Sequence, residues 1–134
     1  MFLKIMPAAA LALMAVLLVF VTAGCSSGPS PTNLAEDFAR QMNERKFGEI
    51  YDLLAVQSPI RKEISRDDFV AQYESIYPDG FRLADFKVTE ERVEGDNMAV
   101  VLWTANAIVP GREDEPTNRT FSMVMEDGAW KIDQ

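Results

Sequence analysis

The sequence predicts an α+β domain in which three N-terminal helices pack on a curved antiparallel meander sheet of about four strands. Two patterns indicate this. Up to about residue 77, apolar residues recur every three or four positions, which is the period of helices with one buried face. After Gly80, apolar and polar residues alternate, which is the period of half-buried strands. The order of helices before strands favours the α+β class over a parallel α/β fold.

Helix boundaries follow from capping and stop residues. The first helix is predicted over about residues 33–45, because Asn33 has a glutamate three residues later, which is the spacing of a capping box. The second begins near Phe47 and ends before Pro59, since a residue that precedes proline is disfavoured in the helical region. The third begins after Ser65, a typical N-cap residue, and ends at a Pro-Asp-Gly turn.

The remaining chain reads as strands separated by turns. Four strands are predicted, at residues 86–89, 98–109, 120–126 and 129–132. Glu-Gly-Asp-Asn and Asp-Gly sequences predict tight turns after the first and third strands. A polar loop is predicted over residues 110–118.

An apolar segment precedes the domain. Lys4 is the only charged residue before Cys25, and residues 5–21 are all apolar or proline. A core helix would have a polar face, and a membrane-spanning helix needs about 20 apolar residues. A basic start, an apolar run and small residues before the cysteine are typical of a signal peptide, which we assign to residues 1–24.

Val21 to Cys25 resembles the lipobox of prokaryotic lipoproteins, although Thr22 stands where that family most often has leucine. The resemblance implies that Cys25 is lipidated and becomes the new N-terminus, anchored extracytoplasmically to the cell membrane. Residues 25–32 would form a Ser/Gly/Pro-rich tether, and residues 33–134 the domain. The alternative is an uncleaved membrane anchor with a free cysteine. Both interpretations place the domain on the outer side of a membrane.

Composition excludes several kinds of site. The chain has 13 basic and 21 acidic residues and a net charge of −8, which argues against a nucleic-acid partner. Histidine is absent, which removes histidine-based zinc sites and the usual general base near neutral pH. We expect no metal site and no cofactor. Asn118 begins an Asn-Arg-Thr sequence that fits N-glycosylation, a short motif that also occurs often by chance.

The stretch from Ile64 to Val70, followed by Tyr73 and Tyr77, resembles the N-terminal domain of methicillin-resistance-type penicillin-binding proteins. The closing strand, Gly-Ala-Trp-Lys-Ile-Asp, resembles that of small lipoproteins of the same nuclear transport factor 2-like superfamily. The resemblance implies a cone-shaped domain, and sheet-mediated homodimers are common in this superfamily. The Ser-x-x-Lys and Lys-Thr-Gly motifs of a transpeptidase domain do not occur in this sequence.

Two kinds of site in the cone are considered. Trp103 is followed on the same strand face by two alanines, which leaves room for a pocket or for a packed helix. The candidate lining residues are Tyr73, Trp103, Phe121, Met123, Trp130 and Asp52. Some superfamily members are enzymes, and Asp52 would be the best-placed general base here, although the sequence groups no partner with it.

The hypothesis favoured by the sequence is a non-catalytic cell-envelope lipoprotein that binds a small apolar ligand or an envelope protein. It would be attached to the membrane through lipid on Cys25. The alternatives are a small acid–base enzyme of the isomerase or hydratase type that uses Asp52, and a structural accessory of an envelope complex. A homodimer is a further expectation, which the resemblance implies.

Overall fold

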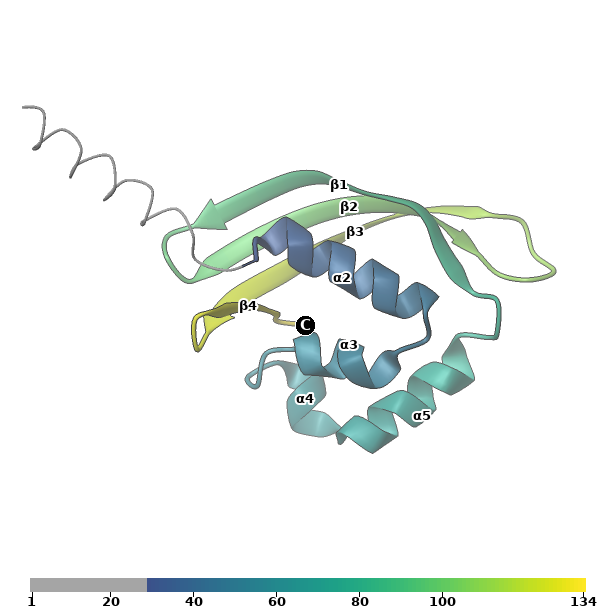
Figure 1. Ribbon diagram of the computed structural model, residues 1–134, viewed down its shortest axis with the longest axis horizontal. Coiled ribbons are helices and arrows are strands. Elements are labelled where there is room, and N and C mark those ends of the chain that lie inside the picture. The colour runs from purple at the N-terminus through teal and green to yellow at the C-terminus, as the bar shows by residue number, and fades with distance from the viewer. Residues whose placement is uncertain (1–28) are drawn as a thin grey trace, which may run out of the picture.

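The computed structural model describes residues 29–134, so the proposed signal peptide and Cys25 lie outside the described residues. Helices come first and strands follow, as predicted (Figure 1). The helices are α2 (Pro31–Asn43), α3 (Phe47–Leu53), α4 (Pro59–Glu63) and α5 (Arg66–Ile76). The strands are β1 (Arg82–Glu94), β2 (Met98–Ile108), β3 (Glu115–Glu126) and β4 (Ala129–Ile132). The predicted α+β class and four-stranded antiparallel meander are confirmed.

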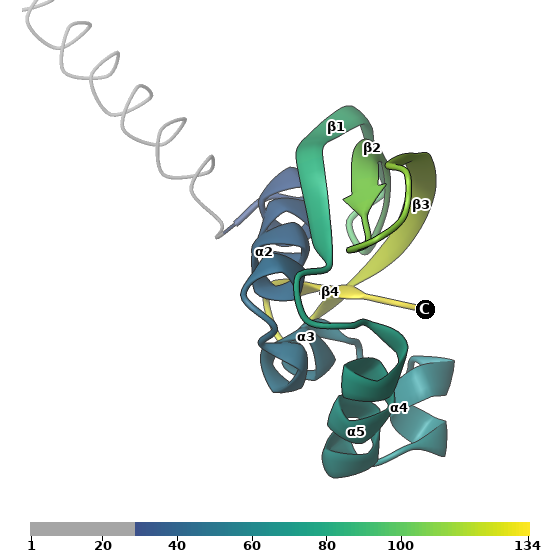
Figure 2. The ribbon, with the colours of Figure 1, turned by 90° about the vertical axis from the view of Figure 1, so that its right-hand side faces the viewer.

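The sheet has the order β1-β2-β3-β4, with every neighbouring pair antiparallel. Helix α2 lies along one face of it, while α3, α4 and α5 gather below the sheet (Figures 1 and 2). The short strand β4 pairs only with residues 123–126 of β3. Its other edge is covered by the chain after α3, where the Ala55 N–H donates to the Ile132 carbonyl at 2.7 Å.

Curvature of the sheet arises from irregular pairing between β1 and β2. The register shifts between Ala84 and Lys87 and again between Val88 and Glu90. Asp85 has a φ of 54°, in the left-handed region. Such bulges bend a strand and increase its twist, which lets the sheet wrap around α2.

The core lies between α2 and the concave face of the sheet. Alternate residues of β2 point into it, and Ala99, Val101, Trp103 and Ala105 are all buried. The largest side chains with almost no exposure are Phe47, Phe69, Ile50, Met123 and Ile132. The described residues therefore contain a continuous core to which both helices and strands contribute.

Two helix predictions need correction. Helix α2 begins at Pro31 rather than Asn33, because Ser30 is the N-cap and forms a capping box with Asn33. The tether predicted to reach residue 32 therefore ends before Pro31. Helix α4 was not predicted at all: Ser58 caps it and Pro59 occupies its first turn, where proline is favoured. Pro59 was interpreted only as a stop residue.

Two strand predictions were too short. β1 extends over Arg82–Glu94, beyond the predicted residues 86–89. β3 starts at Glu115, so much of the predicted polar loop, including Asn118, is a strand. Both extensions are paired with the long strand β2 over their length. Pairing with a neighbour stabilises polar strand residues whose composition alone indicates a loop.

Asn43 joins the end of α2 to the start of β1. Its Nδ2 donates to the Leu83 carbonyl at 3.1 Å, and its Oδ1 accepts from the Leu83 N–H at 2.8 Å. Asn43→Ala leaves both backbone groups without these partners, so we expect it to lower the free energy of unfolding by about 1–3 kcal/mol. Urea denaturation measures this loss. Asn97→Ala, in the exposed β1–β2 turn, is the matched control and should change stability by less than about 0.5 kcal/mol.

Candidate functional site

A pocket of about 450 Å³ lies on the concave side of the sheet. Its apolar wall consists of Phe38 and Met42 from α2, Trp103 and Phe121 from the sheet, and Tyr77 and Phe81 from the segment between α5 and β1. Glu115, Thr117 and Arg119 of β3 line its polar side, together with Gln134. The volume lies within the range of about 300–1,000 Å³ that is usual for small-molecule sites.

The pairing of β2 with β3 explains why there is space. Trp103 lies opposite Arg119, Ala105 opposite Thr117, and Ala107 opposite Glu115. Successive inward positions on β2 therefore change from a large indole ring to two methyl groups. The space that the small alanine side chains leave is bounded by α2 on one side and by Tyr77 and Phe81 on another.

Trp103 is the centre of an aromatic group at the base of this pocket. Its ring centroid lies 5.0 Å from Phe86, 5.6 Å from Phe121 and 6.4 Å from Phe38. The side chain is almost fully buried, yet its indole N–H has no hydrogen-bond acceptor among the described residues. A buried donor without a partner costs about 1–3 kcal/mol, so this atom is an unusual feature of the core beneath the pocket.

The residues proposed from the sequence as pocket lining occupy several places. Trp103 and Phe121 line the concave pocket. Met123 is fully buried in the core, and Trp130 on β4 packs against it while half-buried. Tyr73 lies on α5 and lines a separate depression of about 250 Å³ beside Ile60 and Ile64. The sequence did not indicate that Phe38, Tyr77 and Phe81 line the pocket. Their proximity depends on how α2 and the chain after α5 pack on the sheet.

Asp52 lies away from the concave pocket, on α3. Its two carboxylate oxygens accept from Nε and Nη2 of Arg66 on α5, each at 3.0 Å, and about half of each side chain is exposed. The hydrogen bond and the charge of Asp52 raise the pKa of Arg66 above its usual value. This bidentate ion pair connects α3 with α5 and engages both carboxylate oxygens, one of which a general base would need to accept a proton.

Tyr73 provides a pH-dependent test of the α5 packing. Burial, and to a smaller degree Tyr77, raises the pKa of Tyr73 above 10.0. Above about pH 10 the unfolded chain therefore releases a proton that the folded protein retains, so this contribution to stability falls as pH rises toward the raised pKa. We expect Tyr73→Phe to match the original protein at pH 7, and to be the more stable of the two at pH 11. Urea denaturation at both pH values measures the difference. A constant difference would contradict the prediction.

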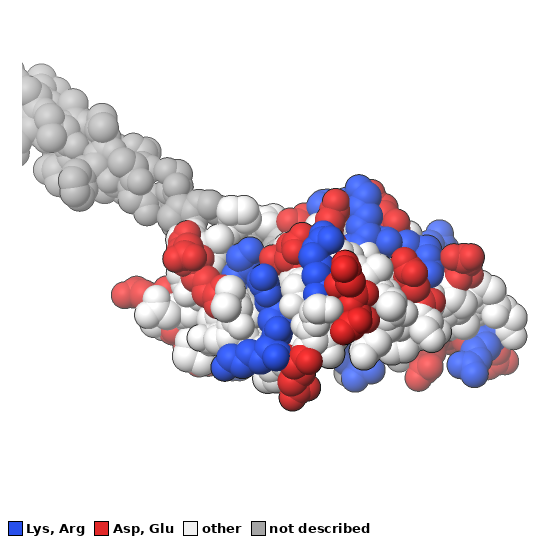
Figure 3. All heavy atoms as spheres, turned by 90° about the horizontal axis from the view of Figure 1, so that it is seen from below, with Lys and Arg blue, Asp and Glu red and all other residues white. Residues whose placement is uncertain are grey.

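Charged residues of both signs are interspersed on the face of the molecule seen from below (Figure 3). Figure 3 shows acidic and basic side chains alternating across one face of the molecule, without a large region of one sign. Within residues 29–134, no group of three potential ligands is arranged to hold a metal ion. The helices in that part of the chain are also too short or too polar to cross a membrane.

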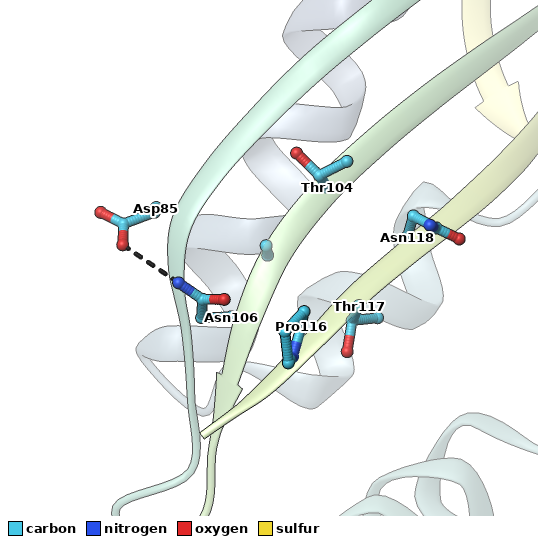
Figure 4. Close-up of a pocket in the computed structure, with 7 residues that line it drawn as sticks. Asp85, Thr104, Asn106, Pro116, Thr117 and Asn118 are labelled. Carbon is cyan, nitrogen blue, oxygen red and sulfur yellow. Dashed lines mark hydrogen bonds between the residues drawn. The ribbon is translucent and has the colours of Figure 1, made fainter. Parts of the chain in front are cut away.

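A second, polar depression of about 280 Å³ lies across β1, β2 and β3 (Figure 4). Asn106 donates from Nδ2 to Oδ2 of Asp85 at 3.3 Å, and Thr104 lies opposite Asn118 in the strand register. Asn118 is exposed there, within a strand rather than at the end of a loop. Strand alternation points Thr104 and Asn106 away from the buried face that carries Trp103 and Ala105.

Residues 30–134 match the family described as the NTF2-like N-terminal transpeptidase domain. The chain belongs to this family. The match covers every described helix and strand, and it confirms the resemblance inferred from the residues around Ile64 to Tyr77.

One curated relative is penicillin-binding protein 3 of Bacillus subtilis (strain 168), which is 35% identical over 89 residues. The similarity covers 62% of this chain but only 13% of that protein. The chain therefore spans only a small part of this relative, whose activity as a whole is not assigned to it.

Two solved structures share the fold. A SEC-C motif containing protein from Rhodopseudomonas palustris has a TM-score of 0.61 and 17% identity, covering 84% of this chain and 82% of its own. A putative NTF2-like transpeptidase from Campylobacter jejuni has a TM-score of 0.51 and 14% identity, covering 78% and 97%. At these identities the likeness concerns the fold alone.

Proposed function

We propose that this family member is a non-catalytic binding domain, held on the outer side of a membrane through Cys25, which takes a small apolar ligand into its concave pocket. The observation that carries the proposal is the pocket itself: about 450 Å³ of space with aromatic and aliphatic side chains on one side and polar side chains on the other. Pockets of this size and lining are the usual form of small-molecule sites. The lipobox-like sequence that ends at Cys25 supports the location.

Binding explains the pocket better than acid–base catalysis does. A general base must be oriented by a hydrogen-bonded partner and must reach the substrate. Glu115, the carboxylate side chain in the pocket lining, has no side-chain hydrogen bond or ion pair with another described residue. Asp52 is engaged with Arg66 outside the pocket. The arrangement therefore supplies a cavity with one apolar wall and without an assembled acid–base pair.

Photolabelling of the intact protein in its membrane tests this proposal. A neutral alkyl diazirine partitions into lipid and apolar cavities, and its attachment sites are located by peptide mass spectrometry. We expect labelled peptides that carry the pocket residues Phe38, Tyr77 or Phe121. Labelling confined to residues before Ser30 would show that only the membrane-proximal segment meets the probe, and would overturn the proposal.

A variant with a filled pocket can be compared with a variant that carries the same substitution at an exposed position. Ala107→Trp places a large ring in the cavity and should abolish labelling of the pocket peptides. Ala71→Trp makes the same change at an exposed position of α5 and should leave labelling unchanged. Thr117→Trp fills the cavity from the neighbouring strand β3. It replaces Ala107→Trp if that variant does not show a cooperative thermal transition.

A further inference from the structure

We infer that the ligand of the concave pocket is an anionic amphiphile: an alkyl chain along the aromatic wall, with a carboxylate or phosphate head group beside Arg119. This inference rests on the proposed function and specifies the chemistry that the pocket selects. Three features carry it: a guanidinium without a carboxylate partner, a buried indole donor next to it, and the separation of the apolar and polar walls.

Arg119 is the first feature. It is exposed on β3, lies directly opposite Trp103 and lines the pocket. Among the described residues no carboxylate lies within ion-pair distance of it, which is also true of Arg61, Arg82 and Arg112 but not of Arg40, Arg45, Arg66 or Arg92. Arg119 differs from the other unpaired arginines in lining the concave pocket. A free guanidinium beside a cavity is well suited to a carboxylate or phosphate, which it can bind through two parallel hydrogen bonds.

The second feature is Trp103, across the strand pair from Arg119. Its indole N–H is buried and has no acceptor among residues 29–134. An indole nitrogen can only donate, so an oxygen acceptor is the partner that it lacks. An anionic head group beside the exposed Arg119 would give the indole N–H a partner only after the ring turned toward the pocket, because this N–H is closed to solvent in the structure.

The third feature is the distribution of polarity around the pocket. Phe38, Tyr77 and Phe81 form a wall without charge, and Arg119 lies on the strand across from it. Glu115 also lines the pocket, but it is four residues from Arg119, which corresponds to roughly 13 Å along a strand. The anionic head group is therefore expected at the Arg119 end of the pocket rather than at the Glu115 end.

Competition against the diazirine probe tests the head-group preference. Decanoate, decanol and decyltrimethylammonium share one alkyl chain and differ in charge. With the intact protein in its membrane, we expect decanoate to prevent pocket labelling at roughly tenfold lower concentration than decanol. Decyltrimethylammonium should be the weakest competitor. Decyl phosphate, compared with decanoate, distinguishes a phosphate-headed from a carboxylate-headed source.

Variants separate recognition by the pocket from partition into lipid. Arg119→Gln should abolish the advantage of decanoate over decanol while decanol competes as before. Arg112→Gln, an exposed arginine in the loop before β3, should retain the full advantage. Equal competition by decanoate and decanol in the original protein, or an advantage that survives Arg119→Gln, would overturn the inference. Absence of pocket labelling by the neutral probe would instead overturn the proposed function.

Discussion

Phe69→Ala is expected to lower the free energy of unfolding by about 3–5 kcal/mol. Phe69 has 1% of its surface exposed and is the one residue of α5 that is fully buried. Its ring stacks on Tyr73 with centroids 4.1 Å apart and lies 5.3 Å from the ring of Tyr51 on α3. Removal of the ring leaves a cavity between α3 and α5 in addition to the lost burial.

The other residues of α5 contribute little buried surface, so the packing of this helix depends mainly on the ring of Phe69. The remaining residues of the helix are exposed or half-buried. One other contact is the exposed ion pair between Asp52 and Arg66. A second lies just after the C-terminal end of α5, where Arg45, in the loop between α2 and α3, donates from Nη1 to the carbonyls of Tyr77 and Pro78 at 2.9 and 2.8 Å. Exposed ion pairs contribute about 0–1 kcal/mol, much less than a buried phenyl ring.

Chemical denaturation with urea measures the loss. The matched control is Ile76→Ala, which removes a large apolar side chain from the same helix at a position that is 63% exposed. It should change stability by less than about 0.5 kcal/mol. Similar losses for the two variants would mean that α5 is not held to α3 through the ring of Phe69.

The main features of the fold were predictable because local signals agree with the final structure. Ser65 caps α5 as the sequence indicated, and its side chain accepts from the Asp68 N–H. The alternation along β2 placed Trp103 and Ala105 on one buried face. Features that depend on partners distant in sequence were missed. The first half of β3 is polar, and it forms a strand because it pairs with the edge of β2.

The candidate site was predictable only in part for the same reason. The change from Trp103 to small residues on one strand face is visible in sequence and marks the space that the pocket occupies. Arg119 was noticed only as the middle of a glycosylation motif, although its register opposite Trp103 places it in the pocket lining. Asp52 was considered for its residue type, and its ion pair with Arg66 depends on the packing of α3 against α5.

Cys25→Ser is expected to eliminate the acylated form of the protein completely. The thiol is the group that accepts the diacylglyceryl moiety in the lipoproteins that the sequence resembles, and a serine hydroxyl does not replace it. Each buried methylene contributes about 0.8 kcal/mol, so two or three acyl chains anchor a protein stably. Intact mass of membrane-extracted protein, with incorporation of a labelled palmitate analogue, measures the change.

A thiol moved along the tether is the matched control for position. The double change Cys25→Ser with Ser30→Cys keeps one cysteine but places it directly after Pro29 instead of after small residues, and it should also give no acylated form. The original protein should show the mass of the chain from Cys25 onward plus acyl chains. An unacylated mass that includes residues 1–24 would instead make the apolar segment the anchor. The prediction that the domain lies on the outer side of the membrane is common to both interpretations, so this result would change the anchor and leave the proposed location of the domain as it stands.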